Sequence, residues 1–129
     1  MASLVLAGDT SGAITVSAPA VAGSNTVTIP ASTGTMALTS DVIGVGQTWQ
    51  DVSASRTAGV TYTNSTGKPI MVATRTTATS ADFSITVSGV VAALCSNAAT
   101  TRIFLTTIVP NGATYVVSGY QAGFWSELR

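Results

Sequence analysis

The sequence predicts an all-β protein in two parts, an extended and intertwined N-terminal β arm over residues 1–42 and an antiparallel β-sandwich over residues 43–129. Three observations predict this fold class. Apolar and polar residues alternate with a period of two in many short segments, as in strands with one covered face. Turn-forming residues separate these segments at regular spacing. Outside residues 90–94, where one helical turn is an alternative, no 3.6-residue apolar period is sustained over three turns.

The arm is made of short β-type segments of small residues, separated by turns rich in Gly, Ser, Asp and Pro. Residues 1–40 contain no aromatic side chain and one charge, Asp9. No side chain here is large enough to build an ordinary core, so the Val, Ile and Leu rows need copies of the segment or another protein to cover them. The expected strands cover residues 3–7, 13–18, 25–30 and 35–39.

The C-terminal part contains every aromatic residue of the chain and follows a hinge at residues 40–46, which include two glycines. Residues 83–87 show the pattern most clearly, because Phe83, Ile85 and Val87 alternate with Ser and Thr. In residues 102–109 the large apolar residues fall on both sides of the alternation, so we expect both faces to be covered. The expected strands cover residues 47–52, 57–63, 69–76, 83–87, 89–96, 102–109, 114–118 and 123–128.

The composition of the chain limits the classes of function that it can have. Charged residues make up 8% of the chain, whereas soluble domains contain roughly 25%. With a net charge of zero and 46% apolar residues, the chain is better explained as a subunit whose apolar faces are covered by partners than as a free β protein coated with hydroxyl groups. The five Lys and Arg residues are scattered, so no nucleic-acid partner is expected.

Targeting signals are also missing from the sequence. No apolar stretch approaches the length of a transmembrane helix, so we expect no membrane insertion. Residue 1 is not followed by the basic region of a signal peptide. We therefore expect synthesis in a cytoplasm without secretion by that route.

The sequence offers little catalytic chemistry. It contains no histidine, which excludes Ser-His-Asp and Cys-His arrangements and histidine-based metal sites. Asp51 and Asp82 are the one conceivable glycosidase pair, but two solvated or capping carboxylates explain them better. We therefore expect no enzymatic activity, no catalytic or metal-binding residue and no cofactor.

The large side chains near the C-terminus are the candidate contact residues. Trp49, Trp125 and Leu128 are expected to anchor a core or a subunit interface. Arg129 either forms ion pairs between chains or is a solvated terminus. Aromatic residues flank the loop at residues 119–123, where they suit carbohydrate binding, although core packing explains any single one more simply. These aromatic residues are Tyr115, Tyr120 and Phe124.

Two stretches resemble bacteriophage tail-fibre and related virion proteins. The first is residues 11–35, which read SGAITV, then PAVAGSNTVTIP, then ASTGT. The second begins with VGQTWQDV at residues 45–52 and continues through YTN, TGKPI and VPNGATY to WSELR at residues 125–129. The second stretch resembles a module at the tip of phage fibres. The two stretches together span most of the chain.

The resemblance implies a homotrimer located in the virion, on the phage tail or alternatively on the head. It implies that the arm attaches to other virion proteins and that the C-terminal domain contacts the host surface, for which surface polysaccharide is a candidate. Because the chain lacks the long shaft of typical fibres, it fits a short trimeric tail fibre or, as the alternative, a head fibre or capsid decoration protein. The expected attachment residues are Leu4, Val5, Leu6, Ile14, Val16, Val27 and Ile29.

Overall fold

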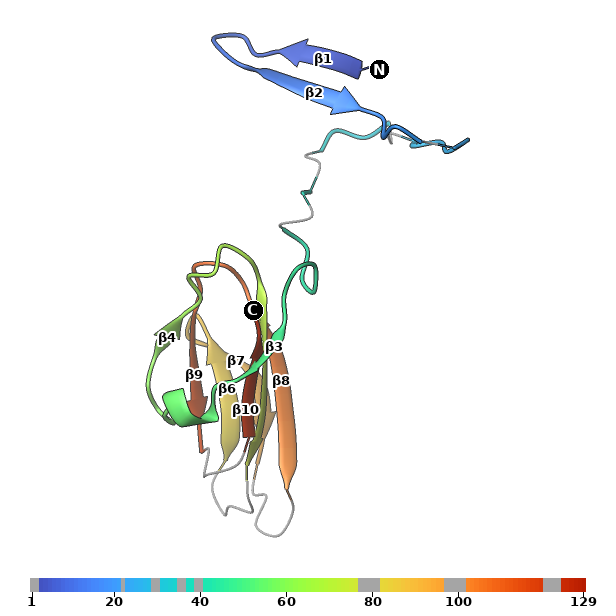
Figure 1. The fold of residues 1–129 in the computed structure, drawn as a ribbon. Coiled ribbons are helices and arrows are strands. Elements are labelled where there is room, and N and C mark those ends of the chain that lie inside the picture. Colours follow the sequence, from blue (N-terminus) through green and yellow to red (C-terminus); the bar gives the residue numbers. More distant parts are fainter. Residues whose placement is uncertain are drawn as a thin grey trace. The chain divides into compact units, whose positions relative to one another are not determined.

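A computed structural model describes residues 3–21, 23–28, 31–34, 37–38, 41–76, 82–96, 102–119 and 124–129 of the chain. The chain divides into two compact units, Met1–Gly34 and Thr35–Arg129. The regular elements in the described ranges are antiparallel strands, apart from 3₁₀ conformation at Asp41 and one turn of 3₁₀ helix at Ser53–Ser55. The prediction of an all-β fold is therefore confirmed (Figure 1).

The first unit contains a two-stranded hairpin, β1 (Ser3–Ala7) and β2 (Ala13–Ser17). Gly12 lies in the connecting turn with a φ of 77°, a conformation that glycine adopts without steric cost. The further strands expected at residues 25–30 and 35–39 are absent where the structure describes those segments, at 25–28 and 37–38. Alternation alone does not make a strand, because a strand also needs a neighbour for its backbone hydrogen bonds.

The second unit contains two four-stranded antiparallel sheets (Figure 1). The first sheet has the order β3-β10-β5-β8, and the second has the order β4-β9-β6-β7. Among the described strands from β3 to β10, consecutive strands lie in different sheets except for β6 and β7, so most neighbouring strands come from distant parts of the chain. The first sheet comprises β3 (Trp49–Asp51), β10 (Phe124–Leu128), β5 (Ile70–Thr76) and β8 (Ile103–Val109). The second comprises β4 (Tyr62–Thr63), β9 (Thr114–Ser118), β6 (Phe83–Val87) and β7 (Val90–Cys95).

One hydrophobic core lies between the two sheets, as in a β-sandwich. Alternate residues of strands such as β5 and β9 point into it, and β5 shows the pattern over its whole length, with every second residue buried. Each fully buried aliphatic or aromatic side chain contributes about 1.5–3 kcal/mol. The first sheet contributes Ile70, Val72, Val109 and Trp125, and the second contributes Phe83, Ile85, Tyr115 and Val117.

The strand expected over residues 57–63 is much shorter in the structure, where only β4 is a strand. Two features explain the difference. Val60 donates a backbone hydrogen bond to the Thr57 carbonyl, which closes a turn, and Gly59 within that turn has a φ of 75°. A turn of this kind cannot continue a strand.

Asn64 fixes the end of the sandwich where two loops meet. Its buried side-chain amide nitrogen donates to the carbonyl oxygens of Lys68, Val109 and Pro110 at 2.7, 3.0 and 3.1 Å. Its side-chain oxygen accepts hydrogen bonds from the backbone and hydroxyl of Thr66. One side chain thus joins the β4–β5 loop to the β8–β9 turn.

Candidate functional site

The outer face of the β3-β10-β5-β8 sheet is largely apolar. The strand register places Trp49, Leu128, Met71 and Ile108 in one row across it. A parallel row four residues along the strands contains Phe124, Arg75 and Phe104. We call this surface the aromatic face and define it by six side chains, some half-buried and most exposed. They are Trp49, Met71, Phe104, Ile108, Phe124 and Leu128.

The aromatic face is exposed in the single chain. Trp49 is 53% exposed and Phe104 is 65% exposed, although both are large apolar side chains. A hollow of about 240 Å³ lies on the same face between Trp49 and Phe124, with Ala73 and Ser126 as its other lining residues. Small residues in the middle strands and large residues beside them produce this hollow.

The aromatic face carries one charge of each sign. The carboxylate of Asp51 lies on β3 and accepts a hydrogen bond from the backbone N–H of Ser53 at 2.9 Å. Hydrogen bonds from the hydroxyl and backbone of Ser53 lower the pKa of Asp51, so this group is ionised at neutral pH. The guanidinium of Arg75 lies 5.8 Å from the ring centre of Phe104, within reach of a cation–π contact.

The other sheet has a different outer face. The register places Ser84, Thr86, Thr114 and Ser118 on the outside of β6 and β9. Hydroxyl groups suit a face that meets water. The large exposed aliphatic residues of this sheet lie on its edge strand β7, where Val91 and Leu94 accompany Val90. The aromatic face is therefore a property of one sheet and not of the whole surface.

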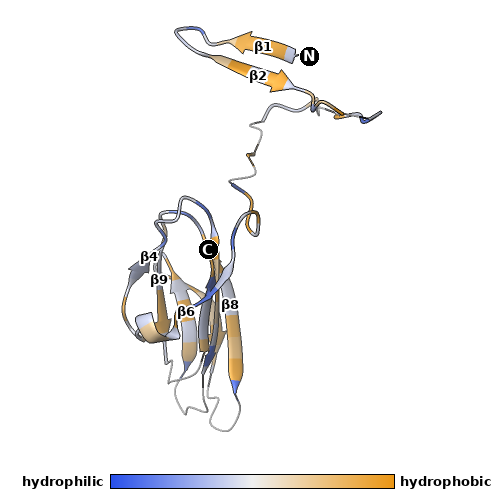
Figure 2. Cartoon of the chain, viewed as in Figure 1, coloured by the Kyte–Doolittle hydropathy of each residue, from blue (hydrophilic) through white to orange (hydrophobic). Residues whose placement is uncertain are grey.

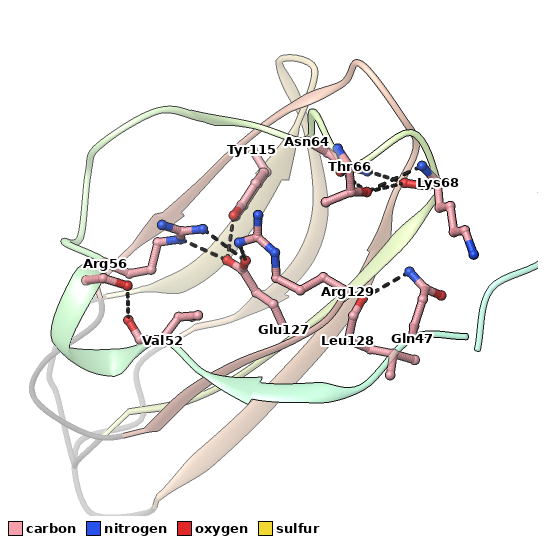
Figure 3. A network of polar contacts seen from close by, with 11 residues as sticks. Gln47, Val52, Arg56, Asn64, Thr66, Lys68, Tyr115, Glu127, Leu128 and Arg129 are labelled. Carbon is pink, nitrogen blue, oxygen red and sulfur yellow. Dashed lines mark hydrogen bonds and ion pairs between the residues drawn. The ribbon is translucent and has the colours of Figure 1, made fainter. Parts of the chain in front are cut away.

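A charged cluster lies inside the sandwich around Glu127, whose side chain is fully buried (Figure 3). Arg56 donates two hydrogen bonds to its carboxylate, from Nε at 2.9 Å and from a terminal nitrogen at 3.0 Å. Tyr115 donates its hydroxyl to the same carboxylate, and Arg129 donates a third guanidinium hydrogen bond at 2.8 Å. The Arg56 guanidinium also lies 4.5 Å from the ring centre of Tyr62.

The pKa of each group follows from this arrangement. Burial acts to raise the pKa of Glu127, but the hydrogen bonds from Arg56 and Tyr115 and the charges of both arginines together lower it below its usual value. Burial, followed by the hydrogen bond to Glu127, raises the pKa of Tyr115. Glu127 therefore remains a carboxylate and Tyr115 a neutral phenol, an arrangement that stabilises the fold and offers no proton near neutral pH.

The structure separates the residues considered for catalysis. Asp51 lies in β3 of one sheet and Asp82 immediately precedes β6 of the other. Among the described residues, no group of three or more Cys, Asp or Glu side chains is arranged to hold a metal ion. In the same residues, no helix is long and apolar enough to cross a membrane.

The predicted anchor residues have different positions. Trp125 is fully buried in the core, whereas Trp49 is exposed and Leu128 is half-buried on the aromatic face. Arg129 is not a free terminus, because its partly exposed side chain pairs with Glu127 and its backbone exchanges hydrogen bonds with Thr48 of the same chain. Roles for Trp49, Leu128 and Arg129 between chains stay predictions.

The predicted host-contact residues also differ. Tyr115 is only 2% exposed, and its ring packs in the core 5.8 Å from the ring of Tyr62. The expectation that Tyr115 contacts a host surface is therefore wrong, because its hydroxyl is occupied by Glu127 and its ring is covered. Phe124 is partly exposed and lies on the aromatic face. Tyr120 lies outside the described residues.

The hairpin presents the predicted attachment residues on two unlike faces. Pairing of Leu4 with Val16 and of Leu6 with Ile14 places these four aliphatic side chains on one face, which we call the aliphatic face. The opposite face carries Ser, Thr and Ala together with Val5. All are exposed (Figure 2 shows the apolar character of both strands). Val27 is exposed outside any strand, and Ile29 lies outside the described residues.

Comparisons of the chain with protein-family models, with curated proteins and with solved structures gave no match. The resemblance of residues 11–35 and 45–129 to phage fibre proteins accordingly stays a prediction.

Proposed function

We propose that this chain is a structural protein of a bacteriophage particle, a short trimeric tail fibre attached through its N-terminal unit and directed at the host surface by its β-sandwich. The single observation that carries the proposal is the aliphatic face of the β1–β2 hairpin, which is uncovered in the chain itself. An isolated two-stranded hairpin is marginally stable at best in water, so such a face needs a partner.

The two-unit organisation supports this proposal. Thr35–Arg129 has its own core and its own buried ion pairs, and Met1–Gly34 is a separate compact unit. Such a division suits an attachment segment joined to a head domain. The low charge of the chain has the same explanation, because surfaces covered in an assembly do not need charges to stay soluble.

A capsid decoration protein or head fibre is the second candidate. The hairpin favours it equally, because an exposed aliphatic face can lie along a head protein as well as along a tail protein. The two candidates differ in what the sandwich does. A tail fibre uses many weak sites on one particle to hold a host cell, whereas a decoration protein needs no cell binding.

A pair of matched variants tests attachment. Leu6 and Val5 are neighbours with 52% and 57% exposure, but they lie on opposite faces of the hairpin. We expect Leu6→Asp to abolish incorporation into particles and Val5→Asp to leave it largely intact, because only the first places a carboxylate in the covered face. Incorporation is measured by quantitative mass spectrometry of purified particles that were assembled with each variant.

Two results would contradict the proposal. Equal incorporation of Leu6→Asp and the unmodified chain would show that the aliphatic face is not the attachment surface. Absence of the unmodified chain from particles would remove the virion role altogether.

A further inference from the structure

The structure points to a specific interface within the proposed assembly: we infer that the aromatic face is the surface through which copies of this chain associate, with one face from each copy turned toward the common axis. This inference rests on the homotrimer of the proposed function and names the surface that forms it. It is carried by the area, the shape and the charge of the face.

The exposed area is large enough for an interface. An aromatic side chain offers roughly 200 Å², so the exposed fractions of Trp49, Phe104, Phe124 and Ile108 together amount to on the order of 400 Å². A standard interface buries about 800 Å² on each partner, of which about two-thirds is apolar when the partners are identical. Four side chains thus supply most of the apolar area that one copy needs.

The face carries both a hollow and an exposed aromatic ring. The hollow between Trp49 and Phe124 and the protruding ring of Phe104 lie on one surface, at different strands of the same sheet. Copies that meet through this surface can therefore place a protruding ring of one in the hollow of the next. A carbohydrate fits the hollow less well, since Ser126 is its only lining residue with a polar side chain and is itself buried.

The charge of the aromatic face also favours a second copy of the chain as its partner. Asp51 and Arg75 give the face one carboxylate and one guanidinium, so two such faces carry no like-charge excess when they meet. The buried Nε of Arg75 has no hydrogen-bond partner among the described residues. The formal net charge of the whole chain is zero, so long-range repulsion does not oppose association.

A matched pair of variants isolates the face. Ile108 lies on the aromatic face in edge strand β8 and is 54% exposed. Leu94 lies on the outer face of the other sheet in edge strand β7 and is 55% exposed. We expect Ile108→Glu to lose the trimer that the unmodified full-length chain forms, and Leu94→Glu to retain it. The measurement is native mass spectrometry together with light scattering, and circular dichroism checks that each variant is folded.

Fluorescence quenching gives a second readout that does not depend on stoichiometry. The chain has two tryptophans, and Trp125 is buried within each copy, so an added quencher such as acrylamide reports on Trp49. We expect Trp49 to be protected in the unmodified chain and accessible in Ile108→Glu. In the variant Trp49→Phe, Trp125 is the one remaining tryptophan, so the difference from the unmodified chain shows which part of the fluorescence comes from Trp49.

The outcomes separate this inference from the proposed function. Two results would overturn the interface but not the trimer. One is a trimer of the unmodified chain in which Trp49 is freely quenched. The other is a trimer that Ile108→Glu leaves intact, with Trp49 still protected. An unmodified chain that is monomeric at micromolar concentration overturns both. Protection of Trp49 in such a monomer would assign the face to this chain's own N-terminal segment, and protection only after host polysaccharide is added would assign it to carbohydrate.

Discussion

Replacement of Arg56 by methionine tests whether the buried carboxylate of Glu127 depends on its arginine partners. Arg56 donates two of the four hydrogen bonds that this carboxylate accepts; Tyr115 and Arg129 donate the others. Methionine keeps an unbranched apolar stem beside the ring of Tyr62 and removes the charge and both donors.

The size of the effect follows from burial. The Glu127 side chain has no exposed surface, and removal of one partner of a buried ion pair costs about 3–5 kcal/mol. Arg129 and Tyr115 still hold the carboxylate after the substitution, so we expect the lower end of this range, about 3 kcal/mol. A domain of this size is stable by about 5–15 kcal/mol, so the loss is a large part of the total.

Urea unfolding followed by tryptophan fluorescence measures this loss. We expect a lower midpoint with an unchanged slope, which indicates a change of stability rather than of the unfolded state. Arg102→Met is the control, because Arg102 is exposed just before β8, and its effect should stay within about 0.5 kcal/mol. A loss for Arg56→Met as small as that of the control would refute the reasoning, since it would mean that water already solvates the carboxylate.

The pH dependence of stability gives an independent check on the same cluster. The pKa of Glu127 is lower in the folded chain than its ordinary value of 4.5, so its charge stabilises the fold above that value. The stabilisation is lost as the pH falls through the folded pKa. We expect Glu127→Gln to be less stable than the unmodified chain at neutral pH and to show a flatter profile in acid. Asp51→Asn should keep most of the slope, because Asp51 is exposed.

Two further substitutions test the loops of the sandwich. Asn64→Asp replaces the amide donor shared by three carbonyl oxygens with a carboxylate, and we expect urea unfolding to show a loss of about 3 kcal/mol. Asn111→Asp is the control, because it keeps the side-chain oxygen of residue 111 that accepts a hydrogen bond from the backbone N–H of Gly67. A loss of stability as large as that of Asn64→Asp would contradict the role given to the Asn64 amide. Gly119→Ala combines a φ of 73° with overlap of the new Cβ on the Asp82 carbonyl oxygen. We expect its melting temperature to fall well below that of the control Gly112→Ala. Gly112 has a similar φ but open space around it, so its replacement costs about 1–2 kcal/mol of stability. Equal melting temperatures would show that the overlap at Gly119 relaxes freely.

The sequence predicted the strands well wherever alternation and pairing agree. The segments expected at residues 83–87 and 114–118 are β6 and β9 to the residue, because each has a covered face and a neighbour on either side. The segment at residues 57–63 was overpredicted, because the turn at Gly59 is decided by one glycine conformation and one backbone hydrogen bond.

The candidate sites were less predictable. Alternation in residues 102–109 led us to expect that both faces are covered, but in the single chain only one side is covered, and Phe104 and Ile108 on the other side are exposed as part of the aromatic face. The cluster around Glu127 joins residues that are 71 positions apart, Arg56 and Glu127, through a contact that exists only after the sheets have packed. Tyr115 was misassigned for the same reason, since an aromatic residue beside a loop gives no sign of the carboxylate that it meets.

Electron microscopy of intact phage particles tests the central claim most directly. Particles purified from cells that produce this chain would be labelled with a gold-conjugated antibody raised against residues 43–129. We expect label at the tail. Label spread over the head would contradict the tail-fibre assignment in favour of a decoration protein, and unlabelled particles would contradict a place in the virion.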